Sequence, residues 1–171
     1  MLTTVVVTTR ERYSVLIESL RSLFNTIPRD TRVIVFDCNA PEAIRQQLRD
    51  LNAQRPFDLH ETDQFHLAPE VRNLALPLVT SKYVCFCDND VFFEQGWLSA
   101  LERNAEQHKS AAVAPLVLIG PTREPLIHHA GGEVHFYRDK KGRNRLHSQH
   151  RLGNKLLSDA VANDYYGLTI D

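Results

Sequence analysis

The chain has 171 residues, enough for one domain with a sizeable core and too few for two large ones. Its 43% apolar and 24% charged residues are ordinary for a folded globular protein, so extensive disorder is not expected. The formal net charge is −1, which argues against a chain built to coat nucleic acid. No run approaches the roughly 20 apolar residues that span a bilayer, so we expect no transmembrane segment.

The first residues and the cysteines bear on location. The chain opens directly into an apolar, β-branched run, without the basic region and cleavage site of a secretory signal. Cys38, Cys85 and Cys87 form an odd set without CxxC spacing, so we expect buried, reduced thiols and neither a disulfide nor a metal site. These features favour a cytoplasmic protein, and a peripheral association with a membrane stays open.

Apolar runs and helical periodicities alternate along the first 120 residues. In chain order, we expect a strand at 2–9, a helix at 13–24, a strand at 32–37, a helix opened by Pro41, a weaker strand at 57–62, a helix at 67–79 that Pro77 ends or kinks, a strand at 83–87, a helix from 97 to 105 and a strand at 111–119. Strands and helices alternating at these lengths predict a mostly parallel sheet with helices on both faces.

The pattern changes after Gly120. Residues 127–136 fit a hairpin or an extended arm, and residues 159–171 look like the approach to another strand. We interpret the basic segment 139–151 as a mobile loop and not as a nucleic-acid site, because interleaved aromatic residues are missing. The sequence therefore suggests a core at 1–120 and a partial extension at 121–171, with no nucleic-acid partner.

Polar residues follow three of the predicted strands, at 8–11, 37–39 and 88–90. In an open parallel sheet, ligands collect at the carboxyl ends of the strands. Asp88 and Asp90 are two carboxylates two residues apart, and together they suit Mg²⁺ or Mn²⁺ that also binds phosphate oxygens. The alternative is that both aspartates only cap a turn or the following helix.

At these residues the sequence resembles family 2 glycosyltransferases with the GT-A fold. The resemblance covers about residues 3–132 in the family's order: the first strand and nucleotide-binding loop at 4–12, the second strand and its base-recognising aspartate at 35–39, the Arg-Asn helix segment at 71–75, the DxD region with the start of the next helix at 83–98, and a segment found in some members at 127–132.

The resemblance implies a Rossmann-like GT-A fold, apparently truncated at the C-terminus. It also implies transfer of a sugar, with inversion, from a nucleotide diphosphate-sugar donor to an acceptor hydroxyl. The residues it implicates are Thr9, Arg10, Glu11, Asp37, Arg72, Asn73 and Asp88 for the nucleotide, and Asp88 and Asp90 for Mn²⁺ or Mg²⁺. His128, His129, Gly131 and Gly132 are candidates for contact with sugar or phosphate, since glycine leaves room for close approach.

Each of these residues also has an ordinary structural interpretation. Asp37 can be a solvated strand end, Arg72 a surface arginine and Asn73 a residue that fixes a local loop. The histidines can be structural or surface residues. The sequence does not choose between these interpretations.

The catalytic base is not identified in the sequence. The resemblance puts it beyond Asp171, with Asp164 and Asp171 as weaker candidates, so we expect nucleotide binding with slow or no transfer by this chain. Two other classes stay open, a non-catalytic nucleotide-binding module and a nucleotidyltransferase, although a glycine-rich phosphate loop with its lysine is not found. The sequence does not choose the donor base, the sugar or the acceptor, which can be a saccharide, a lipid-linked molecule or a protein. Apolar surface left open by a missing half would favour a homo-oligomer.

Overall fold

The structure is a computed structural model that describes residues 2–9, 11–120, 123–150 and 152–162. The chain divides into two compact units, Met1–Glu102 and Arg103–Asp171. This division falls inside helix α4 (Trp97–His108), and the boundary suggested at residue 120 stays a prediction.

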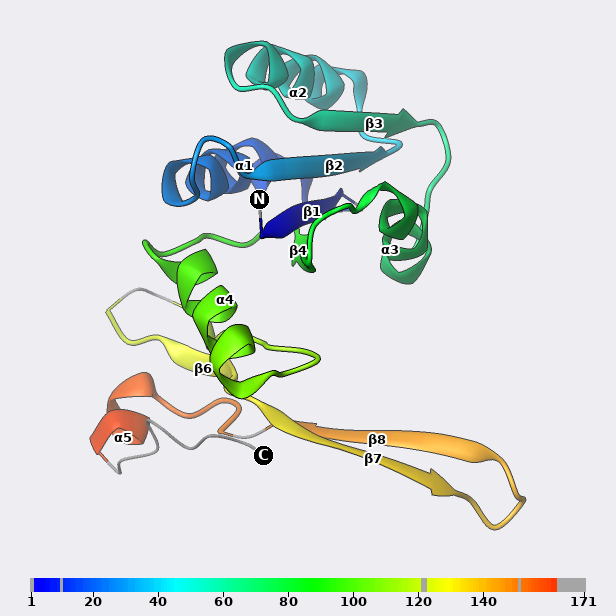
Figure 1. The fold of residues 1–171 in the computed structure, drawn as a ribbon, viewed down its shortest axis with the longest axis vertical. Helices are drawn as coiled ribbons and strands as arrows, with labels where there is room; N and C mark the ends of the chain where they lie inside the picture. The colour runs from blue at the N-terminus through cyan, green and yellow to red at the C-terminus, as the bar shows by residue number, and fades with distance from the viewer. Residues whose placement is uncertain (1, 10, 121–122, 151, 163–171) are drawn as a thin grey trace. The chain divides into compact units, whose positions relative to one another are not determined.

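A four-stranded parallel sheet forms the centre of the first unit (Figure 1). Every neighbouring pair in it is parallel, as the alternation of strands and helices predicted. The strands lie in the order β3, β2, β1, β4, with bounds β1 (Thr3–Thr9), β2 (Arg32–Cys38), β3 (Asp58–Thr62) and β4 (Tyr83–Asp88).

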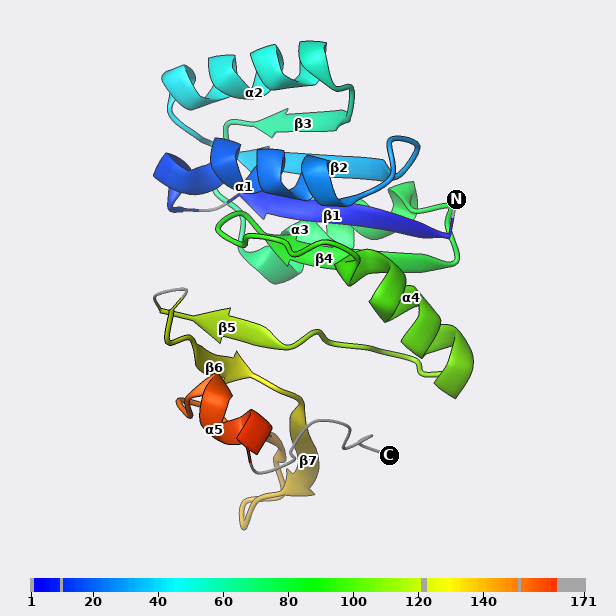
Figure 2. The same cartoon turned by 90° about the vertical axis from the view of Figure 1, so that its left-hand side faces the viewer.

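Helices cover both faces of this sheet (Figure 2). Successive side chains of a strand point to opposite faces, so the run Val5-Val6-Val7 feeds two apolar clusters. Val5 and Val7 pack against α1 (Tyr13–Thr26) and α2 (Glu42–Gln54). Val6 packs against α3 (Ala68–Ala75) on the other face. The predicted arrangement of helices on both faces is confirmed.

The end of α3 shows the expected effect of proline. The α-helix stops at Ala75 and continues as one short 3-10 turn, η1 (Leu76–Leu78), with Pro77 inside it. Proline has no N–H to donate to the preceding turn, so an α-helix cannot continue regularly through this position. The chain then turns into β4.

The second unit contains two separate antiparallel pairs in its described part. The pairs are β5 (Val117–Ile119) with β6 (Leu126–His129), and β7 (Gly132–Arg138) with β8 (Asn144–His150). The strand expected at 111–119 is wrong for residues 111–116, which have no regular structure. Pro115 accounts for part of this, because it cannot donate a ladder hydrogen bond.

Two further expectations for the second unit are wrong. Residues 144–150, interpreted as part of a mobile loop, form strand β8 of the β7–β8 hairpin. Residues 157–162 form the short helix α5 (Leu157–Ala162) where a strand was expected from residue 159. The rest of that expected strand, 163–171, lies outside the described residues. Among the helices of the described chain, none is long and apolar enough to cross a membrane.

Candidate functional site

The carboxyl edge of the parallel sheet brings three polar segments together. In the register of the strands, Thr9 lies beside Asp37 of β2, and Thr8 lies beside Asp88 of β4. Because neighbouring strands are about 4.8 Å apart, the Cα atoms of Asp37 and Asp88 are about 10 Å apart across β1. The distance is within the span of an extended nucleotide diphosphate.

Two contacts join the loop after β1 to the turn after β4. The side-chain amide of Asn89 donates a 2.6 Å hydrogen bond to the backbone carbonyl of Glu11, and Asn89 is only 5% exposed. Asp90 Oδ2 lies 2.5 Å from Arg12 Nη1, with Arg12 mostly exposed and Asp90 mostly covered. Arg12 has a left-handed backbone (φ 56°), which is uncommon for a residue other than glycine. The Asp88–Asp90 turn is therefore fixed to the loop after β1.

Helix α1 holds the segment that follows this turn. Ser19 donates to the carbonyl of Val91 at 2.7 Å, and Ser22 accepts from the backbone N–H of Phe93 at 2.9 Å. One turn further, Thr26 accepts from the indole N–H of Trp97 at 3.2 Å. These three hydroxyl-bearing residues lie on one stripe of the helix, since residues three and four apart are neighbours on its surface. This stripe of hydroxyl groups fixes the segment that directly follows Asp90 against helix α1.

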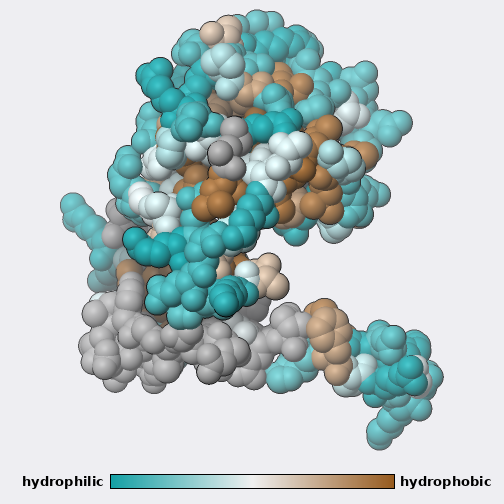
Figure 3. All heavy atoms as spheres, viewed as in Figure 1, coloured by the Kyte–Doolittle hydropathy of each residue, from teal (hydrophilic) through white to brown (hydrophobic). Residues whose placement is uncertain are grey.

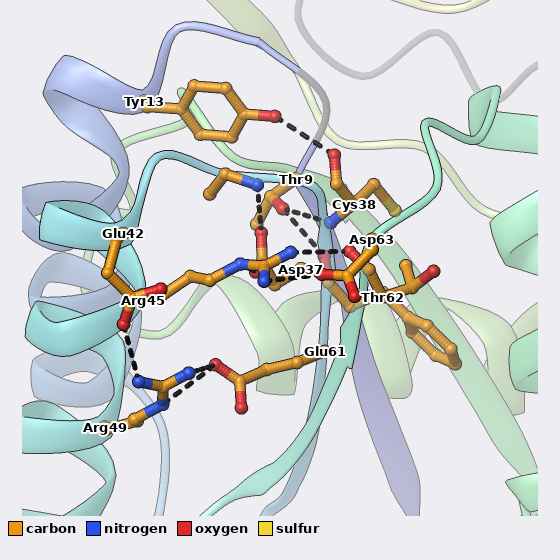
Figure 4. Close-up of polar contacts among 12 residues, drawn as sticks. Thr9, Tyr13, Asp37, Cys38, Glu42, Arg45, Arg49, Glu61, Thr62 and Asp63 are labelled. Carbon is orange, nitrogen blue, oxygen red and sulfur yellow. Dashed lines mark hydrogen bonds and ion pairs between the residues drawn. The ribbon is translucent and has the colours of Figure 1, made fainter.

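Asp37 is fully buried, unlike the solvated strand end that the sequence left open. Figure 4 shows the polar contacts around it. Its Oδ1 accepts from the backbone N–H of Ala40 at 2.9 Å. Its Oδ2 lies 2.8 Å from Nε of Arg45, as an ion pair that lacks the alignment of a hydrogen bond. Arg45 also donates to Asp63 at 2.8 Å and to the carbonyl of Thr62 at 2.7 Å. Asp37 is thus covered by α2 and the end of β3.

Thr9 and Tyr13 are both bonded to the end of β2 (Figure 4). The Thr9 hydroxyl donates to the carbonyl of Phe36 at 2.8 Å and accepts from the N–H of Cys38 at 3.2 Å. The Tyr13 hydroxyl donates to the carbonyl of Cys38 at 3.2 Å. Burial raises the pKa of Tyr13, with a smaller contribution from the charge of Asp37. Burial, followed by the charge of Asp37, also raises the pKa of the Cys38 thiol, so both groups are neutral near pH 7.

The remaining nucleotide candidates of the first unit are exposed, where the structure describes them. Glu11 is exposed and contributes its backbone carbonyl to the site. Arg72 is exposed on α3, with its guanidinium carbon 5.6 Å from the centre of the Phe86 ring, and Asn73 beside it is exposed too. Arg10 lies outside the described residues.

The histidine and glycine candidates belong to the second unit. His128 is exposed and His129 half-buried at the end of β6, and both have interaction partners. Gly131 has a positive φ of 76° in the connection from β6 to β7, a conformation that suits glycine, and Gly132 begins β7. Their contact with sugar or phosphate stays a prediction.

Sequence reasoning did not single out four residues whose hydrogen bonds and ion pairs connect the segments at this edge: Arg12, Asn89, Tyr13 and Arg45. Asn89 lies inside the aspartate motif, Arg12 ends the expected nucleotide-binding loop and Tyr13 directly follows it, so their positions were a usable signal. Nothing in the sequence pointed to Arg45. Its pairing with Asp37 depends on how the loop after β2 and the first turn of α2 fold back on the strand end.

By their chemistry, Asp88 and Asp90 suit a hard divalent cation only if oxygens of substrate or water complete its shell. In the part of the chain that the structure describes, no group of three or more His, Cys, Asp or Glu side chains could hold a metal ion alone. Mg²⁺ and Mn²⁺ commonly bind through one or two carboxylates together with phosphate and water oxygens. Asp88 is exposed at the strand end, and Asp90 already faces a positive charge on Arg12.

A parallel sheet covered by helices on both faces, with polar residues at its carboxyl edge, is an open α/β fold of the kind that binds ligands at that edge. The chain belongs to Glycosyl transferase family 2, whose sequence profile matches residues 4–161. Among solved structures, it is similar to the crystal structure of S. aureus TarS 1–349, at 22% identity and a TM-score of 0.53. The likeness covers 64% of this chain and 34% of the TarS chain, so this chain spans about a third of that length. No curated protein matches the chain.

Proposed function

We propose that this chain takes part in transferring a sugar from a nucleotide diphosphate donor to an acceptor hydroxyl, with Mn²⁺ or Mg²⁺ bound at Asp88 and Asp90. Membership of the family supports glycosyl transfer in general. In this reaction the bond between the anomeric carbon and the diphosphate oxygen breaks, and a bond to the acceptor oxygen forms. The acceptor proton passes to a base.

The observation that carries the proposal is the connection between the loop after β1 and the turn after β4 at the carboxyl edge of the sheet. Asn89 and Arg12 connect the β1 loop to the β4 turn, so the loop expected to meet the nucleotide and the carboxylates expected to meet its phosphates form one unit. The Asn89 contact can stay in place when ligand binds, so the two segments need little reordering relative to each other, which favours affinity. Helix α4 begins only at Trp97, seven positions after Asp90, so neither aspartate lies where it could cap that helix.

Within this site, the residues divide into two groups. Asp88 and Asp90 would hold the cation, which supplies positive charge that stabilises the leaving diphosphate. Thr9 and Asp37 are buried and bonded to β2 and α2, so in our proposal they form the rigid floor under the nucleotide. The base is not assigned to a described residue, and Asp164 and Asp171 lie outside the described residues.

Calorimetric titration with UDP, GDP and CDP tests the proposal, each with Mn²⁺ and with chelator. We expect one of the three to bind more tightly than the others, and its affinity to rise with Mn²⁺. Equal affinity with Mn²⁺ and chelator would remove the metal from the proposal. Failure of all three nucleotides to bind would remove the nucleotide donor as well.

A further inference from the structure

The β7–β8 hairpin concentrates positive charge. From residue 132 to residue 150 it carries five lysines and arginines against two acidic residues, a net charge of +3. The whole chain has a net charge of −1, so the remainder carries −4. Charge separated in this way attracts an anionic partner to the hairpin.

The hairpin also exposes apolar side chains beside this charge. Phe136 and Leu146 are direct cross-strand partners and are 81% and 59% exposed. Cross-strand partners share a face, and the next pair towards the tip on that face is Arg138 with Asn144. The neighbouring pair His135 and His147 stacks on the opposite face, with ring centres 6.5 Å apart. Figure 3 shows a hydrophobic band on the hairpin next to a hydrophilic tip.

The turn at the tip of the hairpin is well built. The Asp139 carboxylate accepts hydrogen bonds from the backbone N–H groups of Lys141 and Arg143, at 2.9 and 3.0 Å. It also pairs with the side chains of Arg143 and Arg145, at 2.9 and 3.0 Å. Gly142 takes the positive φ of 74° that the turn needs. Lys140 and Lys141 are thereby presented in the exposed turn.

The hairpin leaves surface available to a partner. In the described chain, β7 and β8 form a sheet of two strands with no third strand. Two-stranded sheets are only marginally stable by themselves in water. An exposed apolar pair on one face adds surface that is normally covered.

The chemistry of the hairpin selects among possible partners. A second copy that docked hairpin to hairpin would bring the same positive charge against it, and like charges facing each other are unfavourable. Nucleic acid offers phosphates to the lysines and base faces to Phe136, but gives the aliphatic Leu146 no apolar phase. A bilayer with anionic headgroups offers both negative charge and an apolar layer just below it.

We propose that the β7–β8 hairpin docks on an anionic phospholipid bilayer, with Phe136 and Leu146 entering the interface and the basic tip meeting the headgroups. Docking of this kind is weak for each group alone and depends on charge and apolar contact together. Salt screens the charged part, so binding falls as ionic strength rises. The proposal is independent of the nucleotide site.

Vesicle flotation of the whole chain tests this surface. We compare vesicles of phosphatidylcholine alone with vesicles of phosphatidylcholine and phosphatidylglycerol. The chain should float with the mixed vesicles only. The double variant Lys140→Glu with Lys141→Glu should weaken this binding about tenfold or more, and Phe136→Ser with Leu146→Ser should weaken it on the same vesicles. The matched control is Arg21→Glu with Arg103→Glu, which makes the same charge change at exposed sites on two helices.

A fluorescence readout separates docking from a general effect of charge or misfolding. Phe136→Trp should give an emission blue shift with mixed vesicles, and the parent protein with its single Trp97 gives the background. Equal loss of binding in the control variant would overturn the proposal, as would equal binding to both kinds of vesicle. Binding to single-stranded RNA in the absence of vesicle binding would overturn it in favour of a nucleic-acid surface.

Discussion

Arg12 and Asp90 form an ion pair with 2.5 Å between Nη1 and Oδ2, although 78 positions separate them in the chain. The pair joins the residue that precedes α1 to the turn after β4. It gives Asp90 a positive neighbour at the point where we propose a divalent cation. A cation that binds Asp90 therefore competes with Arg12 for the same carboxylate.

Replacing Arg12 should strengthen metal binding. In Arg12→Ala the cation no longer displaces the guanidinium, and because an exposed ion pair contributes about 0.2–1 kcal/mol, we expect Mn²⁺ affinity to rise about 1.5- to 5-fold. Mn²⁺ titration followed by electron paramagnetic resonance measures this without nucleotide or turnover. Arg21→Ala on α1 is the matched control and should leave the affinity unchanged. A lower Mn²⁺ affinity in Arg12→Ala would contradict the competition.

Replacing Asp90 should remove most of the metal dependence of nucleotide binding. Asp90→Asn loses a charged ligand, which should cost at least about 1.5–3 kcal/mol of the binding gained with Mn²⁺. Calorimetry with the best nucleotide, in Mn²⁺ and in chelator, measures the difference. The chelator values should match those of the parent chain. If the variant keeps the full gain from Mn²⁺, the cation does not bind at Asp90.

Replacing Asp37 should destabilise the fold. The carboxylate is fully buried, so Asp37→Ala leaves the N–H of Ala40 and the Nε of Arg45 without their partner. Leaving buried partners unsatisfied costs about 1–3 kcal/mol, which urea denaturation can measure. The control Asp63→Ala removes the 89% exposed partner of the same arginine and should change stability little. Equal stability of Asp37→Ala and the parent would show that the buried pair is not structural.

The sequence predicts the first unit well because its patterns are local. The run Val5-Val6-Val7 can only be buried on two faces, and Pro77 has to interrupt its helix wherever the helix packs. The pairing of Asp37 with Arg45 could not be predicted, since it depends on how α2 lies against the sheet. The same holds for Arg12 and Asp90, which only the parallel order β1–β4 brings together.

In the second unit, a basic composition was a poor guide to whether a segment is ordered. Residues 139–151 were interpreted as a mobile loop from their basic composition. Apolar and polar residues alternate only weakly in β8. The hairpin turn is held by one carboxylate, because Asp139 accepts hydrogen bonds from backbone N–H groups of the turn and pairs with the side chains of Arg143 and Arg145. A single turn residue gives a sequence pattern too little signal, although Asp followed three residues later by Gly is typical of turns.

Acid should loosen this hairpin turn. The N–H of Arg143 is the main cause that lowers the pKa of Asp139, with Arg145 and the other turn donors adding to it. Because the folded pKa is below the unfolded value of about 3.9, the carboxylate's stabilisation is complete above that value and is lost as the pH falls through the folded pKa. NMR shifts of the Lys141 and Arg143 amides should therefore titrate with a midpoint below about 3.9. In Asp139→Asn this titration should disappear. A midpoint at or above the unfolded value would contradict the hydrogen bonds to the carboxylate.

Substitutions of Thr9 test whether its hydroxyl supports the fold beneath the nucleotide or contacts the nucleotide directly. Its hydroxyl donates to the carbonyl of Phe36 and accepts from the N–H of Cys38, and it is fully buried. Thr9→Val keeps the shape and removes both bonds, so we expect a loss of about 1–3 kcal/mol in the free energy of unfolding. Thr9→Ser keeps the hydroxyl and should be the more stable of the two variants. In calorimetry, the folded Thr9→Val protein should bind the preferred nucleotide nearly as tightly as the parent, because the hydroxyl faces β2. A large loss of affinity with unchanged stability would instead place the Thr9 hydroxyl on the nucleotide.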